Sequence, residues 1–311
     1  MFRPPGLRVF LLLMTVSPLA TTAFASALTW ERWPDLPDPV GLKGMYAGVS
    51  DGQILLAGGS NFPVPRAQGG VKTFARVVYV RPVAAGAAGD WRVLENVLPV
   101  ALAEGASVTT EHGVVGLGGA GAAGAVAEVF LLSWKNGALA PLKKLPGLPE
   151  PSATPAAVYW QGRIYVAGGE NRGEGQAQFL SLDLAEALAR PEQTAWEAPP
   201  TWPGPARFGA VLAVLQIGGR EQLVLAGGRI KTTGPARQDD YLTDAYAYDP
   251  VARQWTHLAA MPHRALLATC LRLDIHRLAV MGGSDGHSLE RMAELGAKYR
   301  IPDRIMIYDG R

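Results

Sequence analysis

A pair of adjacent glycines recurs five times along the chain, each time at the end of a short apolar run. The five pairs are Gly58-Gly59, Gly118-Gly119, Gly168-Gly169, Gly227-Gly228 and Gly282-Gly283. Their first glycines lie 60, 50, 59 and 55 residues apart. A repeat of about 50 residues built from short strands is typical of a kelch-type β-propeller, in which each repeat forms one four-stranded blade. We therefore predict an all-β protein, a kelch-type β-propeller with five recognisable blades.

The repeat that ends near Trp255 predicts one blade most clearly. Residues 208–215 and 222–226 are apolar and predict the two inner strands. Residues 246–250 alternate aromatic and small side chains, as a half-buried third strand would. The Asp249-Pro250 pair predicts the following turn, which places Trp255 on the outer strand. Glycine after the second strand permits the positive φ that a crowded centre requires.

The other repeats predict similar blades with less distinct outer strands. The first blade runs from about Gly44 to Trp91. We place the fourth strand of the second blade at 138–142 and that of the third blade around Trp196. The fifth repeat predicts strands at 266–273, 277–283 and 304–308 but no outer strand before the chain stops at Arg311.

Residues 28–33 form a spare strand ahead of the first repeat. Two closures of the ring are therefore open. In one, this strand completes the fifth blade and closes a five-bladed ring. In the other, it is the last strand of a sixth blade whose other strands are absent. Closure of some kind is needed because an open blade exposes unpaired strand edges.

The first 27 residues have the pattern of a secretory signal peptide. Arg3 and Arg8 precede an apolar run that continues to Phe24, and small residues at 23–27 offer a cleavage site. An uncleaved membrane anchor is the rival interpretation. We predict a signal peptide at 1–27, a single propeller domain at 28–311, and a periplasmic or secreted location.

Charge argues against several classes of partner. The full chain carries 29 basic and 27 acidic residues, and the segment 1–27 holds two of the basic ones, so the mature chain has a net charge of zero. This gives no electrostatic basis for binding nucleic acid or an anionic membrane surface. No later stretch has the ~20 apolar residues of a membrane span. We expect a small-molecule partner, no nucleic acid, and no membrane span after signal cleavage.

The sequence indicates neither a cofactor nor a metal. Cys270 is the single cysteine, so no intrachain disulfide can form, and its apolar surroundings predict a small buried side chain. The five histidines show no metal-ligand spacing. Residues 116–121 match the dinucleotide pattern G-x-G-x-x-G, but they fall in register with the other glycine pairs and no βαβ unit surrounds them.

One stretch of the first repeat is more specific than the rest. Ala57-Gly58-Gly59-Ser60-Asn61-Phe62-Pro63 is followed by Gly69-Gly70-Val71-Lys72. Together with residues 129–132 and 299–302, it resembles the cyclically permuted branch of the N-acetylneuraminate (sialic acid) mutarotase family. These proteins are secreted or periplasmic kelch propellers, normally of six blades. The resemblance covers most of the mature chain.

The resemblance implies interconversion of sialic acid anomers by acid–base catalysis. It further implies a glutamate as proton acceptor, with a nearby arginine, in a Gly-Glu-x-x-x-Gly-x-Arg loop. The best match begins at Gly169-Glu170, but Glu174 replaces the second glycine and Gln176 replaces the arginine. In the permuted order that loop belongs to a blade after Tyr308. The sixth blade and its catalytic pair are therefore expected to be absent.

Loops that leave the second strands and enter the first strands crowd one mouth of a propeller. We expect the candidate substrate-binding residues on this rim, and they are Asn61, Arg66, Asn171, Arg207, Arg229 and Asp285. Glu170 is a weak candidate for the catalytic base. Structural roles are an alternative for these residues, because a polar residue after two glycines usually stabilises the turn. The three arginines can equally cap loops or pair with carboxylates.

Two functions remain open at this point. The first is a secreted mutarotase for sialic acid, either active or inactive through loss of the catalytic blade. An arginine fork would suit the carboxylate of such a sugar. The second is a non-catalytic propeller that binds a sugar or a protein.

Overall fold

The computed structural model describes residues 31–230, 240–287, 295 and 302–311. The chain divides into two compact units, Met1–Arg32 and Trp33–Arg311. Of the first unit only Glu31 and Arg32 are described, and neither lies in a helix or strand. None of the described helices is long and apolar enough to cross a membrane. The fold below is that of the second unit.

Five antiparallel sheets follow one another along the chain, and we call them blades 1 to 5. Blade 1 contains β1 (Tyr46–Ser50), β2 (Gln53–Ala57), β5 (Val78–Pro82) and β6 (Arg92–Leu94). Blade 2 contains β7 (Ala106–Thr110), β8 (Gly113–Leu117), β11 (Val129–Leu132) and β14 (Lys143–Leu145). Blade 3 contains β15 (Ala156–Trp160), β16 (Arg163–Ala167) and β19 (Phe179–Asp183). Blade 4 contains β20 (Val211–Ile217), β21 (Arg220–Ala226), β22 (Ala245–Asp249) and β23 (Gln254–Leu258). Blade 5 contains β24 (Thr269–Arg272), β25 (Arg277–Met281) and β26 (Ile305–Asp309).

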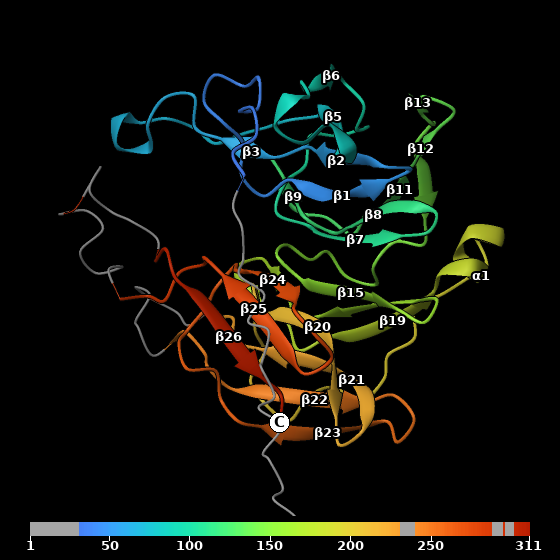
Figure 1. The fold of residues 1–311 in the computed structure, drawn as a ribbon, viewed down its shortest axis with the longest axis vertical. Helices are drawn as coiled ribbons and strands as arrows, with labels where there is room; N and C mark the ends of the chain where they lie inside the picture. The colour runs from blue at the N-terminus through green and yellow to red at the C-terminus, as the bar shows by residue number, and fades with distance from the viewer. Residues whose placement is uncertain (1–30, 231–239, 288–294, 296–301) are drawn as a thin grey trace, which may run out of the picture. The chain divides into compact units, whose positions relative to one another are not determined.

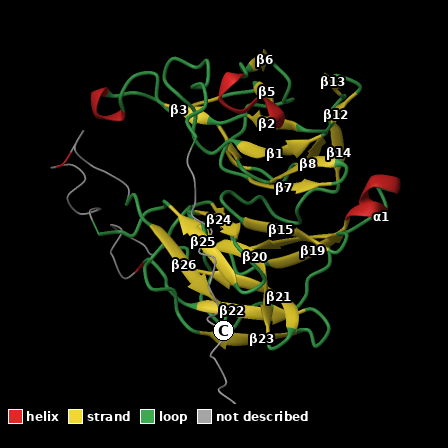
Figure 2. Cartoon of the chain, viewed as in Figure 1, coloured by secondary structure: helices red, strands yellow, loops and turns green. Residues whose placement is uncertain are grey.

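The first strand of each blade lies innermost. In Figure 1, β1, β7, β15, β20 and β24 occupy the middle of the picture, and later strands of each blade lie farther out. Consecutive first strands pack against one another from β1 through to β24. Figure 2 shows that helix in the described part of the chain is confined to short segments, which include the α-helix α1 (Leu184–Ala189). The predicted five-bladed, all-β propeller is confirmed.

Successive side chains of a strand point to opposite faces of the blade, which explains why the blades stack. On β22, Ala245 and Ala247 face the core shared with blade 5, whereas Tyr246 and Tyr248 face the core shared with blade 3. The Tyr248 ring packs edge-on against Phe179 of blade 3, with centroids 4.9 Å apart. A strand with period-two alternation can thus bury both faces when sheets lie on either side.

Two predicted outer strands are wrong. The fourth strand of blade 2 is β14 rather than 138–142. Ala138–Leu139 is strand β13, which pairs with β12 (Trp134–Lys135) in a separate hairpin. Asn136 and Gly137, both at positive φ, close this hairpin in the way Asn-Gly pairs favour. Near Trp196, blade 3 has one isolated bridge, Ser181 to Glu197, instead of a strand.

The chain enters the propeller along blade 1. The Trp33 ring lies 4.3 Å from the Arg81 guanidinium carbon on β5, and the Trp91 indole donates a hydrogen bond to the Pro34 carbonyl. Trp33 therefore lies against blade 1 rather than beside β26. Leu28, Thr29 and Trp30 of the predicted closing strand lie outside the described residues. Among the described strands, β26 pairs with β25 alone.

The first four glycine pairs each join their blade to the next through a main-chain hydrogen bond. The amides of Gly59, Gly119, Gly169 and Gly228 donate to carbonyls that lead into the following blade, those of Leu102, Ser152, Arg207 and Ala265. The contact is close: a Cβ added at Gly58 or Gly118 would lie 2.3 Å from the Leu102 or Ser152 carbonyl oxygen. The repeat seen in the sequence is thus the inter-blade joint itself.

Two residues beyond each acceptor, the chain adopts a left-handed conformation. The five equivalent positions, counting that of blade 1, are Gly44, Glu104, Thr154, Gly209 and Leu267, with φ between +49° and +66°. Each backbone amide in this series donates to the carbonyl of the preceding member, from Glu104 to Gly44 through to Leu267 to Gly209. These residues form a hydrogen-bonded arc around the axis, which we call the axial arc.

The axial arc generates a stability prediction. A β-branched residue at positive φ is strained, and the Thr154 hydroxyl is buried without a hydrogen-bond partner among the described atoms. We expect Thr154→Gly to raise the free energy of unfolding by about 0.5–1 kcal/mol. Gly209→Ala should lower it, because the new Cβ would lie 2.6 Å from Leu266 Cδ1 at a φ of +60°. Urea denaturation measures both, and loss of stability in Thr154→Gly would contradict the strain.

Candidate functional site

The axial arc brings one ionisable side chain to the mouth of the propeller. Of its five members, Glu104 alone carries a charge. Its φ is +61°, a conformation that costs a residue with a side chain about 1–2 kcal/mol. All five members share this left-handed conformation, so the charge of Glu104 is what distinguishes it, and we take Glu104 as the centre of the candidate site.

Two lysines from the first repeat flank Glu104. The Lys72 ammonium lies 2.6 Å from Glu104 Oε1, and the Lys43 ammonium lies 3.3 Å from the same oxygen. The Glu104 and Lys72 side chains are 23% and 25% exposed, whereas Lys43 is 65% exposed. The three groups form a partly buried cluster of net charge +1. We call Lys43, Lys72 and Glu104 the axial cluster.

The two cations control the protonation of Glu104. Burial alone would raise the pKa of its carboxyl group, but the Lys72 hydrogen bond and the charges of Lys72 and Lys43 outweigh that effect. The pKa of Glu104 is therefore held below its ordinary value of 4.5. At neutral pH the cluster presents a carboxylate beside an ammonium.

The specific stretch of the first repeat is what carries Lys72 to this position. Ser60 and Asn61 form β3 and pair with β4 (Thr73–Phe74), so the chain folds back just after Lys72. Ser60 also bridges to Lys43 through the backbone. On the other side, the Cγ of Glu104 lies 2.9 Å from the position that a Cβ on Gly44 would take. Glycine at 44 thus leaves the space that the Glu104 side chain occupies.

The predicted residues Asn61 and Arg66 have different surroundings. The Asn61 amide nitrogen donates to Asp38 at 3.5 Å, and its oxygen accepts from the Thr73 hydroxyl at 2.8 Å. Asn61 therefore ties the β3–β4 hairpin that supports Lys72. Arg66 lies exposed in the short helix Arg66–Gln68 of the same loop.

Glu170 and Asn171 form β17, a strand of the hairpin that follows the third glycine pair. A hollow of about 630 Å³ opens beside this hairpin, and Asn171, Arg172, Glu174 and Gln176 contribute to its wall. Glu170 does not line this hollow; its backbone bridges to Ala153. Asn171 is the predicted residue that faces open space here.

Arg207 and Arg229 are largely withdrawn from solvent. Arg207 is fully buried, and its two terminal nitrogens each lie 2.7 Å from an Asp244 carboxylate oxygen. Burial alone would raise the pKa of Asp244, but the Arg207 hydrogen bonds and charge lower it. Arg229 is 16% exposed and lies 3.6 Å from Asp240. Both guanidiniums therefore serve the protein interior and not an open binding site.

Asp285 follows the fifth glycine pair and lines a second hollow, of about 320 Å³. The axial cluster and this hollow have no described lining residue in common. Within the part of the chain that the structure describes, no group of three or more His, Cys, Asp or Glu side chains could hold a metal ion.

Sequence reasoning missed all three members of the axial cluster as site residues. A signal for Glu104 was nevertheless available. Gly44, Glu104 and Thr154 each lie 14 residues before the first glycine of their repeat, at 58, 118 and 168. Aligning the repeats on their glycine pairs would have placed a charged residue at the axis. No local pattern indicates that Lys72 reaches it, because that contact spans 32 residues.

Comparison with known proteins gives relatives over part of the chain. It is 36% identical over 125 residues to the N-acetylneuraminate epimerase of Brucella suis, which is 36% of this chain and 32% of that protein. It is 34% identical over 124 residues to that of Yersinia enterocolitica, covering 36% and 31%. It is 30% identical over 141 residues to N-acetylneuraminate epimerase 1 of Escherichia coli O6:H1, covering 42% and 35%. The chain thus spans about a third of the length of these curated relatives.

A solved structure of YjhT is similar over almost the whole chain. The TM-score is 0.67 at 12% sequence identity, and the match covers 92% of this chain and 89% of that one. At this identity the likeness establishes the propeller fold alone. No family model matches the chain.

The buried pair of Arg207 and Asp244 gives a second prediction. Asp244→Asn would leave a buried guanidinium without its counter-charge, so we expect the free energy of unfolding at pH 7 to fall by about 3–5 kcal/mol. The loss should shrink as the pH falls below 3.8, because a carboxylate with a lowered pKa stabilises the fold only while it is ionised. Urea denaturation at several pH values measures this.

Glu186→Gln is the matched control for that experiment. Glu186 pairs with Arg190 at 3.1 Å on the exposed surface of α1, where an ion pair contributes less than about 0.5 kcal/mol. Equal losses in the two variants would contradict a structural role for Arg207.

Proposed function

We propose that this chain is a carbohydrate mutarotase that interconverts the anomers of a sialic acid at the axial cluster. The observation that carries the proposal is the Glu104–Lys72 pair, a carboxylate and an ammonium 2.6 Å apart at the mouth of a propeller. The names of the partial relatives support the choice of sugar. The predicted signal peptide supports a periplasmic or secreted location, which we include in the proposal.

Mutarotation requires one group to accept a proton and another to donate one. The Glu104 carboxylate accepts the proton of the anomeric hydroxyl while the Lys72 ammonium donates a proton to the ring oxygen. The bond between the anomeric carbon and the ring oxygen then breaks, which gives the open-chain ketone. Rotation and closure on the other face of the carbonyl reverse both transfers, so neither group changes protonation over the cycle. Such acid–base assistance contributes about 10²- to 10⁴-fold to rate.

Lys43 supplies the contact with the sugar's own carboxylate. It is the most exposed member of the cluster, and its charge is only partly balanced because Glu104 is shared with Lys72. An acidic sugar can therefore bring its carboxylate to Lys43 while its anomeric centre lies near Glu104. Asn61 contributes indirectly, by holding the hairpin that carries Lys72.

The family resemblance implies a glutamate and an arginine in a loop of a sixth blade. The axial cluster offers the same two kinds of group, a carboxylate and a cation, from blades 1 and 2. We include in the proposal a cyclically permuted ring, in which one face of blade 5 is not covered by another described sheet. Exposure supports this: Leu271, Ile305 and Ile307 share one face of blade 5 and are 50%, 36% and 43% exposed.

Gly282 differs from the first glycines of the other pairs. At Gly58 and Gly118 an added Cβ would meet the next blade, whereas at Gly282 no described atom lies within 4 Å. The fifth joint therefore lacks a partner among the described residues.

The function is tested by following the anomers of freshly dissolved sialic acid by proton NMR. The wild-type protein should accelerate their equilibration above the spontaneous rate, and Glu104→Gln should reduce that acceleration at least 10²-fold, since the amide accepts no proton. Glu197→Gln is the control, because Glu197 forms an ion pair of the same length, 2.6 Å, with Arg163 on blade 3.

Two results would contradict the proposal that this protein is a mutarotase acting through Glu104. One is no acceleration by the folded wild-type protein, which would favour a non-catalytic sugar- or protein-binding propeller. The other is equal loss in Glu104→Gln and Glu197→Gln. Unchanged activity in Glu104→Gln would also contradict Glu104 as the base and place the chemistry at other residues of the protein.

The lowered pKa of Glu104 also predicts the acid limb of the pH profile. The base form exists above that pKa, so kcat/KM, which reports ionisation of the free enzyme, should fall as the pH drops through a value below 4.5. Lys43→Met removes one of the two charges that lower the pKa, so the acid limb should move to higher pH. Lys144→Met on the exposed face of β14 should leave it in place. If the acid limb of the pH profile moves in neither Lys43→Met nor Lys144→Met, Glu104 is not the base.

A further inference from the structure

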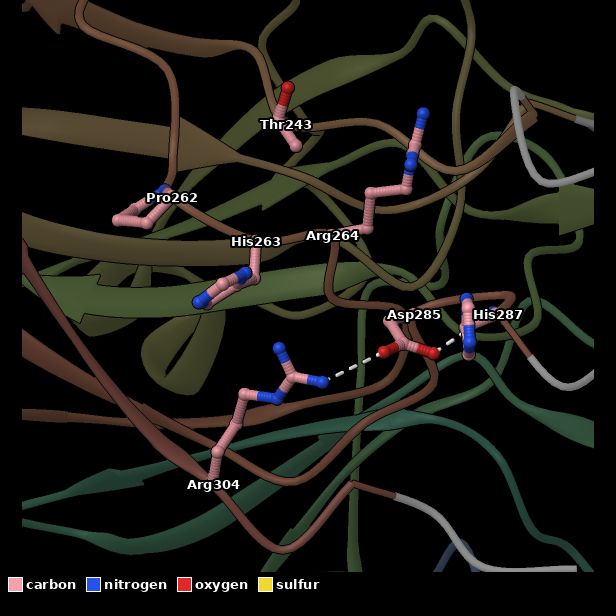
Figure 3. Close-up of a pocket in the computed structure, with 7 residues that line it drawn as sticks. All are labelled: Thr243, Pro262, His263, Arg264, Asp285, His287 and Arg304. Carbon is pink, nitrogen blue, oxygen red and sulfur yellow. Dashed lines mark hydrogen bonds and ion pairs between the residues drawn. The ribbon is translucent and has the colours of Figure 1, made fainter.

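The hollow beside Asp285 lies between blades 4 and 5, away from the axial cluster. Its wall includes Thr243 before β22, His263 and Arg264 in the connection from β23 to β24, and Asp285, His287 and Arg304 around blade 5 (Figure 3). These segments are distant in sequence and meet because each flanks a strand at the same end of its blade. All but Pro262 of the described wall is polar.

The centre of the hollow is an ordered ion pair. Arg304 donates from one terminal nitrogen to Asp285 Oδ2 at 3.0 Å, and the backbone amide of His287 donates to Asp285 Oδ1 at 3.0 Å. In Figure 3 the Arg304 guanidinium points at the Asp285 carboxylate, with His287 on the other side of it. Asp285 is 20% exposed and Arg304 is 46% exposed. Asp285 therefore orients a guanidinium that still reaches solvent.

The charges in the wall favour an anion. The Arg304 guanidinium is 46% exposed, and the bond to Asp285 uses one of its two terminal nitrogens, so donors of a positive group remain open to the hollow. Arg264 is held in place by a hydrogen bond from its Nε to the Tyr241 carbonyl at 3.1 Å. A guanidinium has five donors in a fixed plane, so its bond to Asp285 leaves geometry suited to an oxyanion.

The size and chemistry of the wall narrow the ligand further. A hollow of about 320 Å³ is at the lower end of small-molecule sites. The Thr243 hydroxyl and the two imidazoles can exchange hydrogen bonds with hydroxyl groups, and Pro262 is the one apolar residue among those that line the hollow. A monosaccharide with one acidic group matches both size and charge.

We propose that this hollow is a second ligand site, separate from the axial cluster, which binds a monosaccharide through its carboxylate or phosphate. Arg304 holds the acidic group, Asp285 positions Arg304, and His263 and Thr243 contact the hydroxyls. The proposal does not depend on mutarotase activity, because no residue of the axial cluster takes part.

Isothermal titration calorimetry with three probes tests the site. Glucuronate and glucose 6-phosphate represent the two possible acidic groups, and neutral glucose carries neither. We expect at least one acidic probe to bind and glucose not to bind measurably. Arg304→Gln should weaken the acidic probe at least tenfold. Arg277→Gln should not, although Arg277 is also half-exposed on blade 5 and pairs with Asp274 at 2.6 Å.

A second variant keeps the test sound if Arg304→Gln disturbs the fold. His263 is exposed, so His263→Gln is expected to fold normally and to weaken the same probe. In Lys43→Met, binding that depends on Arg304 should persist, which separates this site from the axial cluster. Binding of glucose equal to glucuronate, equal effects of the Arg304 and Arg277 variants, or no binding of either acidic probe would overturn the proposal. Anomer exchange should be unchanged in Arg304→Gln, so the two sites fail or succeed separately.

Discussion

The architecture depends on a short backbone contact between successive blades. In the first four pairs the second glycine donates its amide to a carbonyl at the entrance of the next blade, and the first glycine leaves room for that carbonyl. A side chain at Gly58 or Gly118 would collide with the neighbouring backbone, which cannot move without parting the blades. Stacked sheets in other folds associate through side chains alone. Here a hydrogen bond between main chains sets the register of each blade against the next.

The axial arc is a direct consequence of this joint. Because the acceptor carbonyl is fixed, the chain two residues later must turn sharply to enter the inner strand. Glycine meets that demand at 44 and 209, but Glu104, Thr154 and Leu267 meet it with side chains. The same geometry that builds the ring therefore presents different side chains at equivalent positions around the axis. One scaffold can in this way hold different chemistry without any change in its strands.

Both proposed sites join elements that are far apart in the sequence. Lys72 reaches Glu104 from a loop of the preceding blade, and Arg304 reaches Asp285 from the far side of the segment 288–301. In each case a carboxylate holds a cation in a defined orientation at the rim. Arg207 and Asp244 are also a guanidinium and a carboxylate, but the Arg207 side chain is fully buried, so this pair has a structural role. Exposure, rather than residue type, separates the two uses.

The repeat in the sequence was sufficient for the fold. Glycine pairs at regular spacing, alternating apolar strands and the Asp249 turn were all local patterns, and all five blades followed from them. Asp249 indeed accepts from the amides of Val251 and Ala252. The outer strands could not be predicted as well, because pairing at the edge of a sheet depends on which segments lie beside it. Ala138 and Leu139 fitted the pattern of an outer strand, but they pair with Trp134 and Lys135 in a hairpin instead.

The site residues likewise fall into two groups, those that local sequence predicted and those that it did not. The sequence by itself placed polar residues on the propeller rim, and Asn171 and Asp285 do line hollows. It could not say that Arg207 is buried against Asp244, or that Lys72 meets Glu104, because these contacts span 37 and 32 residues and depend on how distant parts of the chain pack together. Local pattern determined the blades, since strand and turn formation depend on neighbouring residues. Tertiary packing decided which charges meet, since that depends on how the blades close around the axis.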